Sequence, residues 1–198
     1  MLRPLSILLL LISSALAAQP LDSFRILNHL DNYGNLDLRG KPYTELPPGV
    51  VINGNLNMAK TQIKSLPAGT TIEGSLNASN SALAKLGKGV TIKGYANLLG
   101  SQIKRWPNGI KVGGYLNFTD TPLEKLPNRM KVNGDLSVVR TPLEALPENI
   151  IIKGDLYLGG SKITQFPNTM TVNGNIFLGG NRITKWPENL TLGGAVAP

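Results

Sequence analysis

Residues 136–155 read LSVVRTPLEALPENIIIKGD, and this 20-residue unit is repeated eight times between residues 36 and 195. One slot of the unit holds glycine in every copy: Gly54, Gly74, Gly94, Gly114, Gly134, Gly154, Gly174 and Gly194. A second slot holds proline in all copies except the one with Gly87: Pro47, Pro67, Pro107, Pro127, Pro147, Pro167 and Pro187. A fixed period of this length predicts a solenoid in which each repeat forms one coil.

Each unit is predicted to contain two short strands joined by turns. Within residues 136–155, the apolar side chains expected to point inward are Leu136, Val138, Leu143, Leu146, Ile150 and Ile152. Their alternation near both ends of the unit has the period of two that is typical of strands, and the proline-broken segments between are too short for an α-helix. We expect Gly154 to form a corner, through a positive φ or a sharp bend without a Cβ clash, and Pro147 to form another.

A single coil of this kind cannot enclose its own apolar residues. Coils stacked about 4.8 Å apart would bring identical columns together into a continuous core. We therefore predict an all-β fold, a parallel β-solenoid of eight 20-residue coils. One inward column contains Leu46, Leu66, Leu86, Trp106, Leu126, Leu146, Phe166 and Trp186. Its three aromatic residues are interpreted as core, and the alternative is a ligand platform.

Three regions are predicted along the chain. Residues 1–17 combine Arg3, an apolar run and small residues, which indicates a signal peptide, so the mature protein is expected to be secreted or periplasmic. Residues 18–35 are expected to form a short helical cap that begins at Asp22 or Ser23. The apolar residues expected to cover the first coil are Phe24, Ile26, Leu27 and Leu30. Residues 36–198 form the repeat solenoid, whose uncovered last strands leave end-to-end self-association open.

Composition narrows the function classes. The chain has no cysteine, which excludes a disulfide framework, a thiol nucleophile and a lipoprotein attachment site. Its net charge of +8 favours acidic partners, including an anionic glycan or an envelope surface. No nucleic-acid motif accompanies the basic residues, so no nucleic-acid partner is expected. Beyond the signal peptide, no segment is long and apolar enough for us to expect a membrane span.

Residues 176–187 read IFLGGNRITKWP, which resembles the leucine-rich repeat pattern LxLxxNxLxxLP. The resemblance extends over residues 36–195 and is to the short bacterial type with Leu-Pro turns. In most copies a hydroxyl residue replaces the Asn of the pattern: Thr61, Ser81, Ser101, Thr121, Thr141 and Ser161. The resemblance implies a parallel sheet used for protein recognition, often between a bacterium and a host or neighbour, and it implies no catalytic activity.

Two outward columns of the first strand supply the candidate site. One column contains Asp37, Asn57, Asn77, Asn97, Asn117, Ser137, Tyr157 and Phe177. Its asparagines are interpreted as a hydrogen-bonded ladder, with a glycan-binding strip as the alternative. Tyr95 and Tyr115 lie in a neighbouring column and, with Leu99, predict an exposed aromatic cluster typical of an interaction surface. The residues expected to contact a protein partner are Tyr95, Asn97, Tyr115, Asn117, Tyr157 and Phe177.

Few residues in the sequence favour catalysis. His29 is the only histidine, lies in the cap and is expected to be solvated, with no metal-ligand spacing around it. Stacked carboxylates are the alternative, either the pair Asp135 and Asp155 or the pair Glu124 and Glu144, as in β-helix enzymes that cleave polysaccharides. We expect an exported, non-enzymatic scaffold without cofactor or metal that binds a protein partner. The alternatives are a carbohydrate- or surface-binding solenoid and, less favoured, a polysaccharide-cleaving enzyme.

Overall fold

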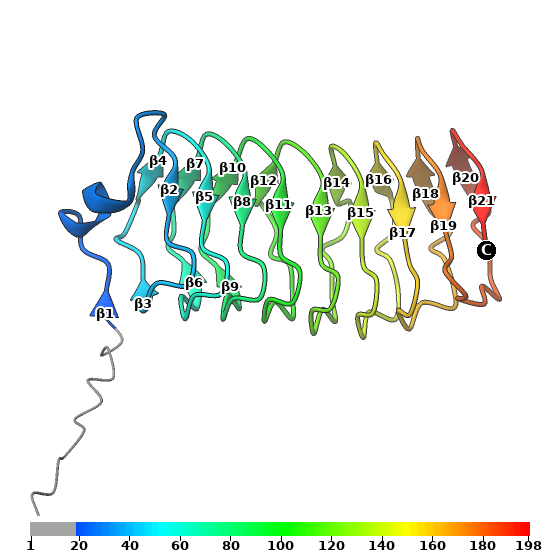
Figure 1. Ribbon diagram of the computed structural model, residues 1–198. Coiled ribbons are helices and arrows are strands. Elements are labelled where there is room, and N and C mark those ends of the chain that lie inside the picture. Colours follow the sequence, from blue (N-terminus) through cyan, green and yellow to red (C-terminus); the bar gives the residue numbers. More distant parts are fainter. Residues whose placement is uncertain (1–18) are drawn as a thin grey trace, which may run out of the picture.

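The computed structural model describes residues 19–198, and the predicted signal peptide lies outside the described residues. The described chain is an all-β, parallel β-solenoid (Figure 1). Nine of its strands form one sheet, which we call the front sheet: β2 (Leu36–Asp37), β5 (Leu56–Asn57), β8 (Leu76–Asn77), β11 (Ala96–Asn97), β13 (Leu116–Asn117), β15 (Leu136–Ser137), β17 (Leu156–Tyr157), β19 (Ile176–Phe177) and β21 (Val196–Ala197). Every neighbouring pair is parallel with a register of 20 residues, as the period predicts.

The opposite side of the solenoid contains two separate sheets. The first back sheet comprises β4 (Val51–Ile52), β7 (Thr71–Ile72), β10 (Thr91–Ile92) and β12 (Lys111–Val112). The second back sheet comprises β14 (Lys131–Val132), β16 (Ile150–Ile152), β18 (Thr169–Val172) and β20 (Asn189–Leu192). A shorter third side contains β6 (Ser65–Leu66) and β9 (Lys85–Leu86), followed by isolated parallel bridges. The eight sequence repeats are thus eight coils, and β21 begins a ninth.

The inward columns form one continuous core. All six residues expected to point inward in residues 136–155 are buried, from Leu136 at 0% exposure to Leu146 at 5%. Trp106 and Phe166 are also buried, which confirms their assignment to the core. Trp186 was assigned wrongly, because 43% of it is exposed. It lies in the last full coil, and no further coil in the described chain covers it.

The hydroxyl residues that replace the Asn of the repeat pattern have a structural role inside the solenoid. Thr61, Ser81, Thr121 and Thr141 are buried, and each side chain donates a hydrogen bond to the carbonyl three residues earlier at 2.7–2.8 Å. A buried hydroxyl needs such a partner to offset its loss of water. These four hydroxyls therefore stabilise the turns after β5, β8, β13 and β15, whereas the buried Ser101 hydroxyl after β11 has no hydrogen-bond partner within residues 19–198.

The recurring glycine forms a corner because successive coils approach closely there, and not because it has a positive φ. Gly154 is not among the residues with positive φ, so that part of the expectation is wrong. A Cβ at Gly154 would lie 2.8 Å from the backbone nitrogen of Asp135 in the preceding coil. The Gly154 N–H donates to the Gly134 carbonyl at 3.0 Å, and equivalent bonds join most neighbouring corners. Glycine is required because successive coils approach closely here.

The N-terminal cap differs from the expected plug. It contains β1 (Gln19–Pro20), which pairs with β3 (Tyr43–Glu45), and the 3₁₀-helix η1 (Arg25–His29). The Asp22 carboxylate accepts the backbone N–H groups of Phe24 and Arg25 at 2.9 and 2.7 Å, as expected of a capping residue. Leu21, however, is the buried residue of the cap.

The apolar residues assigned to the plug mostly face solvent. Phe24, Leu27 and Leu30 are exposed, and Ile26 alone of that set packs partly against the core. In a 3₁₀-helix, residues three apart lie on the same face, so Phe24, Leu27 and Leu30 share a face and turn outward together. None of the helices in residues 19–198 has the length and apolar character to cross a membrane.

Candidate interaction face of the front sheet

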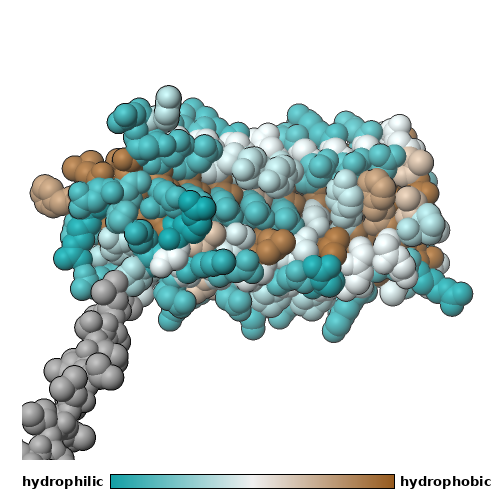
Figure 2. Space-filling view, in the orientation of Figure 1, coloured by the Kyte–Doolittle hydropathy of each residue, from teal (hydrophilic) through white to brown (hydrophobic). Residues whose placement is uncertain are grey.

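The side of the molecule that carries the front sheet is largely polar with separate apolar patches, and a further apolar patch lies over the N-terminal cap (Figure 2). The predicted contact residues all lie on this side. Asn97, Asn117, Tyr157 and Phe177 are the second residues of β11, β13, β17 and β19. Tyr95 and Tyr115 directly precede β11 and β13. The structure thus brings the six residues onto one face, in two groups along the solenoid.

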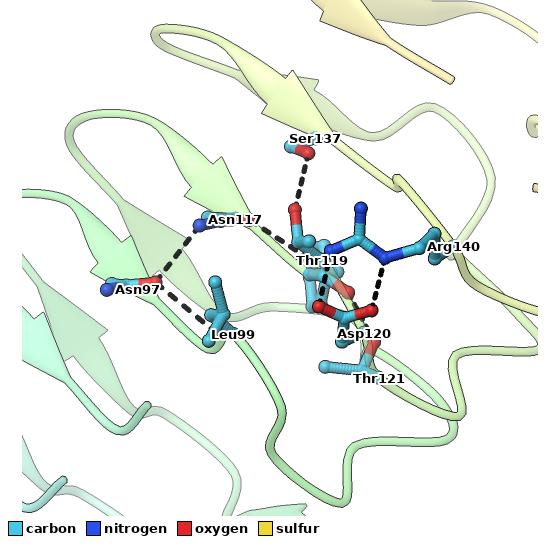
Figure 3. A network of polar contacts seen from close by, with 9 residues as sticks. Asn97, Leu99, Asn117, Thr119, Asp120, Thr121, Ser137 and Arg140 are labelled. Atoms are coloured by element: carbon cyan, nitrogen blue, oxygen red, sulfur yellow. Dashed lines mark hydrogen bonds and ion pairs between the residues drawn. The ribbon is translucent and has the colours of Figure 1, made fainter. Parts of the chain in front are cut away.

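The asparagine column is mainly a set of turn-forming side chains. The side-chain oxygens of Asn57, Asn77, Asn97 and Asn117 each accept the backbone N–H two residues later, at 3.0–3.3 Å. Between amides of this column, the described chain has a hydrogen bond only from Asn117 to Asn97, at 3.1 Å (Figure 3). The predicted continuous ladder is therefore wrong, because each amide oxygen is directed along its own turn.

A second polar column forms the ladder that the first does not. It contains the residue just before each front strand: Asn35, Asn55, Ser75, Tyr95, Tyr115, Asp135, Asp155, Asn175 and Ala195. Where the side chain is Asn, Asp or Ser, its oxygen accepts the backbone N–H of the column residue in the next coil, at 2.6–3.2 Å. The sequence analysis did not identify this role, although polar residues recurring at a spacing of 20 are a visible signal.

Tyr95 and Tyr115 interrupt this ladder. A phenol ring cannot place an acceptor beside the next coil's backbone. Within residues 19–198, the backbone N–H groups of Tyr115 and Asp135 therefore donate no such bond to a side chain of the preceding coil. The two rings instead stack, with centroids 4.4 Å apart and planes 7° from parallel. Tyr95 is 39% exposed and Tyr115 is 36% exposed. The chain therefore places an exposed aromatic pair at a position where smaller polar residues would join the coils.

Tyr157 and Phe177 form a second stack in the asparagine column. Their ring centroids lie 4.8 Å apart, with planes 5° from parallel. Both residues are half-buried, and the Tyr157 hydroxyl donates to the Asp155 carboxylate at 3.2 Å. This stack is less accessible than the Tyr95–Tyr115 pair.

Between the two stacks lies a polar network (Figure 3). The Arg140 guanidinium donates twice to the Asp120 carboxylate, at 2.6 Å for both bonds, and joins two neighbouring coils. The hydroxyls of Thr119 and Ser137 are hydrogen-bonded at 2.8 Å. These contacts join the turns that follow Asn117 and Ser137, and the sequence analysis did not single them out.

Tyr115, Asp120 and Asp155 of this face have shifted pKa values with clear causes. Burial, followed by the adjacent Tyr95, raises the pKa of the Tyr115 phenol above its usual value. The Arg140 side chain lowers the pKa of the Asp120 carboxyl. Hydrogen bonds from Asn175, the backbone N–H foremost, lower the pKa of the Asp155 carboxyl. Asp120 and Asp155 are therefore ionised at neutral pH, and their charge is engaged in holding coils together.

Most of the residues considered for catalysis make hydrogen bonds within the fold. Asp135 and Asp155 belong to the polar ladder. Glu124 and Glu144 line a shallow hollow with Lys162. The His29 ring is half-buried and hydrogen-bonded to the Tyr43 hydroxyl at 2.8 Å, so the expectation of a fully solvated histidine is wrong. Within residues 19–198 there is no group of three or more His, Cys, Asp or Glu side chains arranged to hold a metal ion.

Comparison with protein-family models, with curated proteins and with solved structures finds no match to this chain. The structure itself shows the architecture, a β-solenoid with coils of about 20 residues.

Proposed function

We propose that this protein is an exported, non-enzymatic scaffold that binds a protein partner through the front sheet, with the Tyr95–Tyr115 stack at the centre of the interface. The observation that carries the proposal is the break in the polar ladder. Two tyrosines occupy positions where Asn, Asp or Ser would each contribute a hydrogen bond between coils. Large exposed aromatic residues are enriched at protein interfaces, which gives this replacement a functional reason.

The orientation of the rings favours a protein over a carbohydrate. Because the tyrosines lie in successive coils and stack nearly parallel, each ring covers one face of the other. Sugar rings generally pack on an open aromatic face, whereas protein side chains and backbone can contact edges and hydroxyls. The hydroxyl column that a carbohydrate-binding solenoid would use is represented by buried Thr61, Ser81 and Thr121.

The resemblance to leucine-rich repeats supports the same proposal and adds a location for the protein. Proteins with that pattern recognise other proteins, often at a bacterial surface, and the predicted signal peptide would deliver this chain to the periplasm or the medium. Replacing residues 1–17 with a sequence lacking the apolar run should leave the protein inside the cell. Mass measurement of the exported protein should show cleavage after Ala17 or Ala18.

The test of the interface uses a matched pair of tyrosine variants. Tyr33 is 85% exposed in the cap and lies outside the proposed face, so Tyr33→Ala is the control for Tyr115→Ala. In a cross-linked pull-down from cell envelope and medium, Tyr115→Ala should weaken recovery of the partner about 30-fold, the effect of a central interface aromatic worth about 2 kcal/mol. Retention of every partner by Tyr95→Ala, Tyr115→Ala and the double variant would contradict the proposal.

A further inference from the structure

The two back sheets are separated by a cleft between β12 and β14. No backbone hydrogen bond joins these strands, whereas β11, β13 and β15 of the same coils pair continuously on the front. Figure 1 shows a wider interval between β12 and β14 than between other neighbouring back strands. The cleft has a volume of about 660 Å³, within the 300–1,000 Å³ typical of ligand sites.

The strand edges on both sides of the cleft carry backbone groups that are open to further hydrogen bonds. In the next coil pair, the N–H groups of Ile151 and Lys153 donate to the carbonyls of Met130 and Val132 at 2.9 and 3.0 Å. The equivalent N–H groups across the cleft, those of Lys131 and Asn133, have no protein acceptor in the described chain. The Val112 carbonyl is reached only by the Asn133 side chain, at 2.9 Å. An added strand could pair with these groups.

The side chains around the cleft define the chemistry of such a strand. Its floor is apolar and includes Trp106, Ile110 and Met130. Its rim carries Lys111, Arg129 and Lys131, and no acidic residue lines it. Within residues 19–198 none of these three cations is in an ion pair, whereas the nearby Lys93 is paired with Glu73. The cleft thus combines an apolar base with uncompensated positive charge.

We propose that this cleft binds an extended acidic segment of a protein chain, which adds a strand between β12 and β14. Alternate residues of an extended strand point to opposite sides. Apolar residues of the segment would then pack on Trp106 and Met130, while carboxylates between them meet Lys111 and Lys131. This site lies on the back of the solenoid and is independent of the proposed front interface.

Binding is measured through the fluorescence of Trp106, in a Trp186→Phe background that removes the other tryptophan. The probe is a blocked six-residue peptide of alternating Val and Glu, about 20 Å long when extended. It should change Trp106 emission saturably, and the affinity should fall as salt screens the charges. A peptide of alternating Val and Lys should not bind.

Paired charge variants locate the site. Lys111→Gln with Lys131→Gln should weaken the Val-Glu peptide about tenfold, as expected for the loss of two exposed ion pairs. Lys85→Gln with Lys125→Gln removes the same charge from the third side and should leave the affinity unchanged. Tyr115→Ala should also have no effect, which separates this inference from the front interface.

Several results would overturn the inference. These are the absence of Val-Glu peptide binding, equal binding of the Val-Lys peptide, and an equal loss in the two lysine double variants. Binding of an oligogalacturonate at the cleft without peptide binding would assign the site to an acidic glycan instead.

Discussion

The front sheet and the two back sheets are formed by the same coils, yet only the front sheet is unbroken. On the front, strand pairing joins every successive coil, and the glycine corners and the polar ladder, which repeat with the same spacing, join most of them. On the back, the turn residue with positive φ changes from Gly109 to Arg129 just where the sheet divides. A shared period fixes the register of a solenoid, but each side still needs its own contacts between coils.

Large side chains account for the position of the division. Trp106 occupies a column that holds leucine in most coils, and it packs edge-to-face against the buried Phe118 with centroids 5.2 Å apart. We attribute the opening between β12 and β14 to the volume of these two rings in neighbouring coils, because Trp106 lines the cleft. The front strands of these coils stay paired through their own backbone bonds and the Asn97–Asn117 bond, although the corner bond between Gly134 and Gly114 is absent here.

The largest expected effect compares truncation of a front and a back core residue. Leu136→Ala removes a fully buried side chain from the continuous side and should lower the free energy of unfolding by about 3 kcal/mol. Val112→Ala removes a half-buried side chain beside the cleft and should cost less than about 1 kcal/mol. Urea denaturation of both variants measures the difference. Equal losses would show that the cleft side is as tightly packed as the front.

A smaller effect is expected from the polar ladder. Asn55→Ala removes the acceptor for the Ser75 N–H and should lower the free energy of unfolding by about 1 kcal/mol. Asn55→Asp keeps this acceptor and removes only the bond that the Asn55 amide donates to the Asn35 side chain at 3.0 Å, so it is the control for the acceptor. Thermal unfolding of the two variants compares them directly. If both behave alike, the ladder does not contribute to the strength of the front side.

The smallest expected effect concerns pH. Because the pKa of Asp155 is lowered in the folded state, its contribution to stability is present above the unfolded pKa of about 4 and is lost as pH falls through the folded value. Asp155→Asn keeps the acceptor, as Asn35 and Asn175 do in the same column, and should reduce the loss of stability in acid. Denaturation midpoints at neutral pH and near pH 3 provide the measurement. An unchanged acid dependence would mean that the Asp155 charge is not coupled to folding.

The sequence predicted the architecture because its information is periodic. Leu116, Leu136 and Leu156 lie 20 residues apart, and they do pair in adjacent strands and are buried. Features that depend on one coil or on an end were predicted less well. Trp186 has the pattern of a core residue but lacks a covering coil, and Phe24 and Leu27, which the 3₁₀ turn places on one face, are both exposed.

The candidate site shows the same contrast between periodic features, which the sequence predicted, and features of single coils, which it did not. The sequence placed Tyr95 and Tyr115 on an exposed face, and the structure confirms that they are exposed neighbours. It could not show that Asn57 and Asn77 serve their own turns, because an amide can bond along its strand or across to the next. The cleft was also missed, because Ile110 and Met130 follow the apolar pattern of coils that remain closed.

Native-state hydrogen exchange at single residues tests the contrast between the two sides most directly. The backbone amides of Leu116 and Leu136, which are bonded to the next coil, should exchange slowly, as should those of Ile151 and Lys153 in the second back sheet. The amides of Lys131 and Asn133, at the edge of the cleft, should exchange orders of magnitude faster. Equal protection of Lys131, Asn133, Ile151 and Lys153 would contradict a solenoid that is continuous on the front and divided on the back.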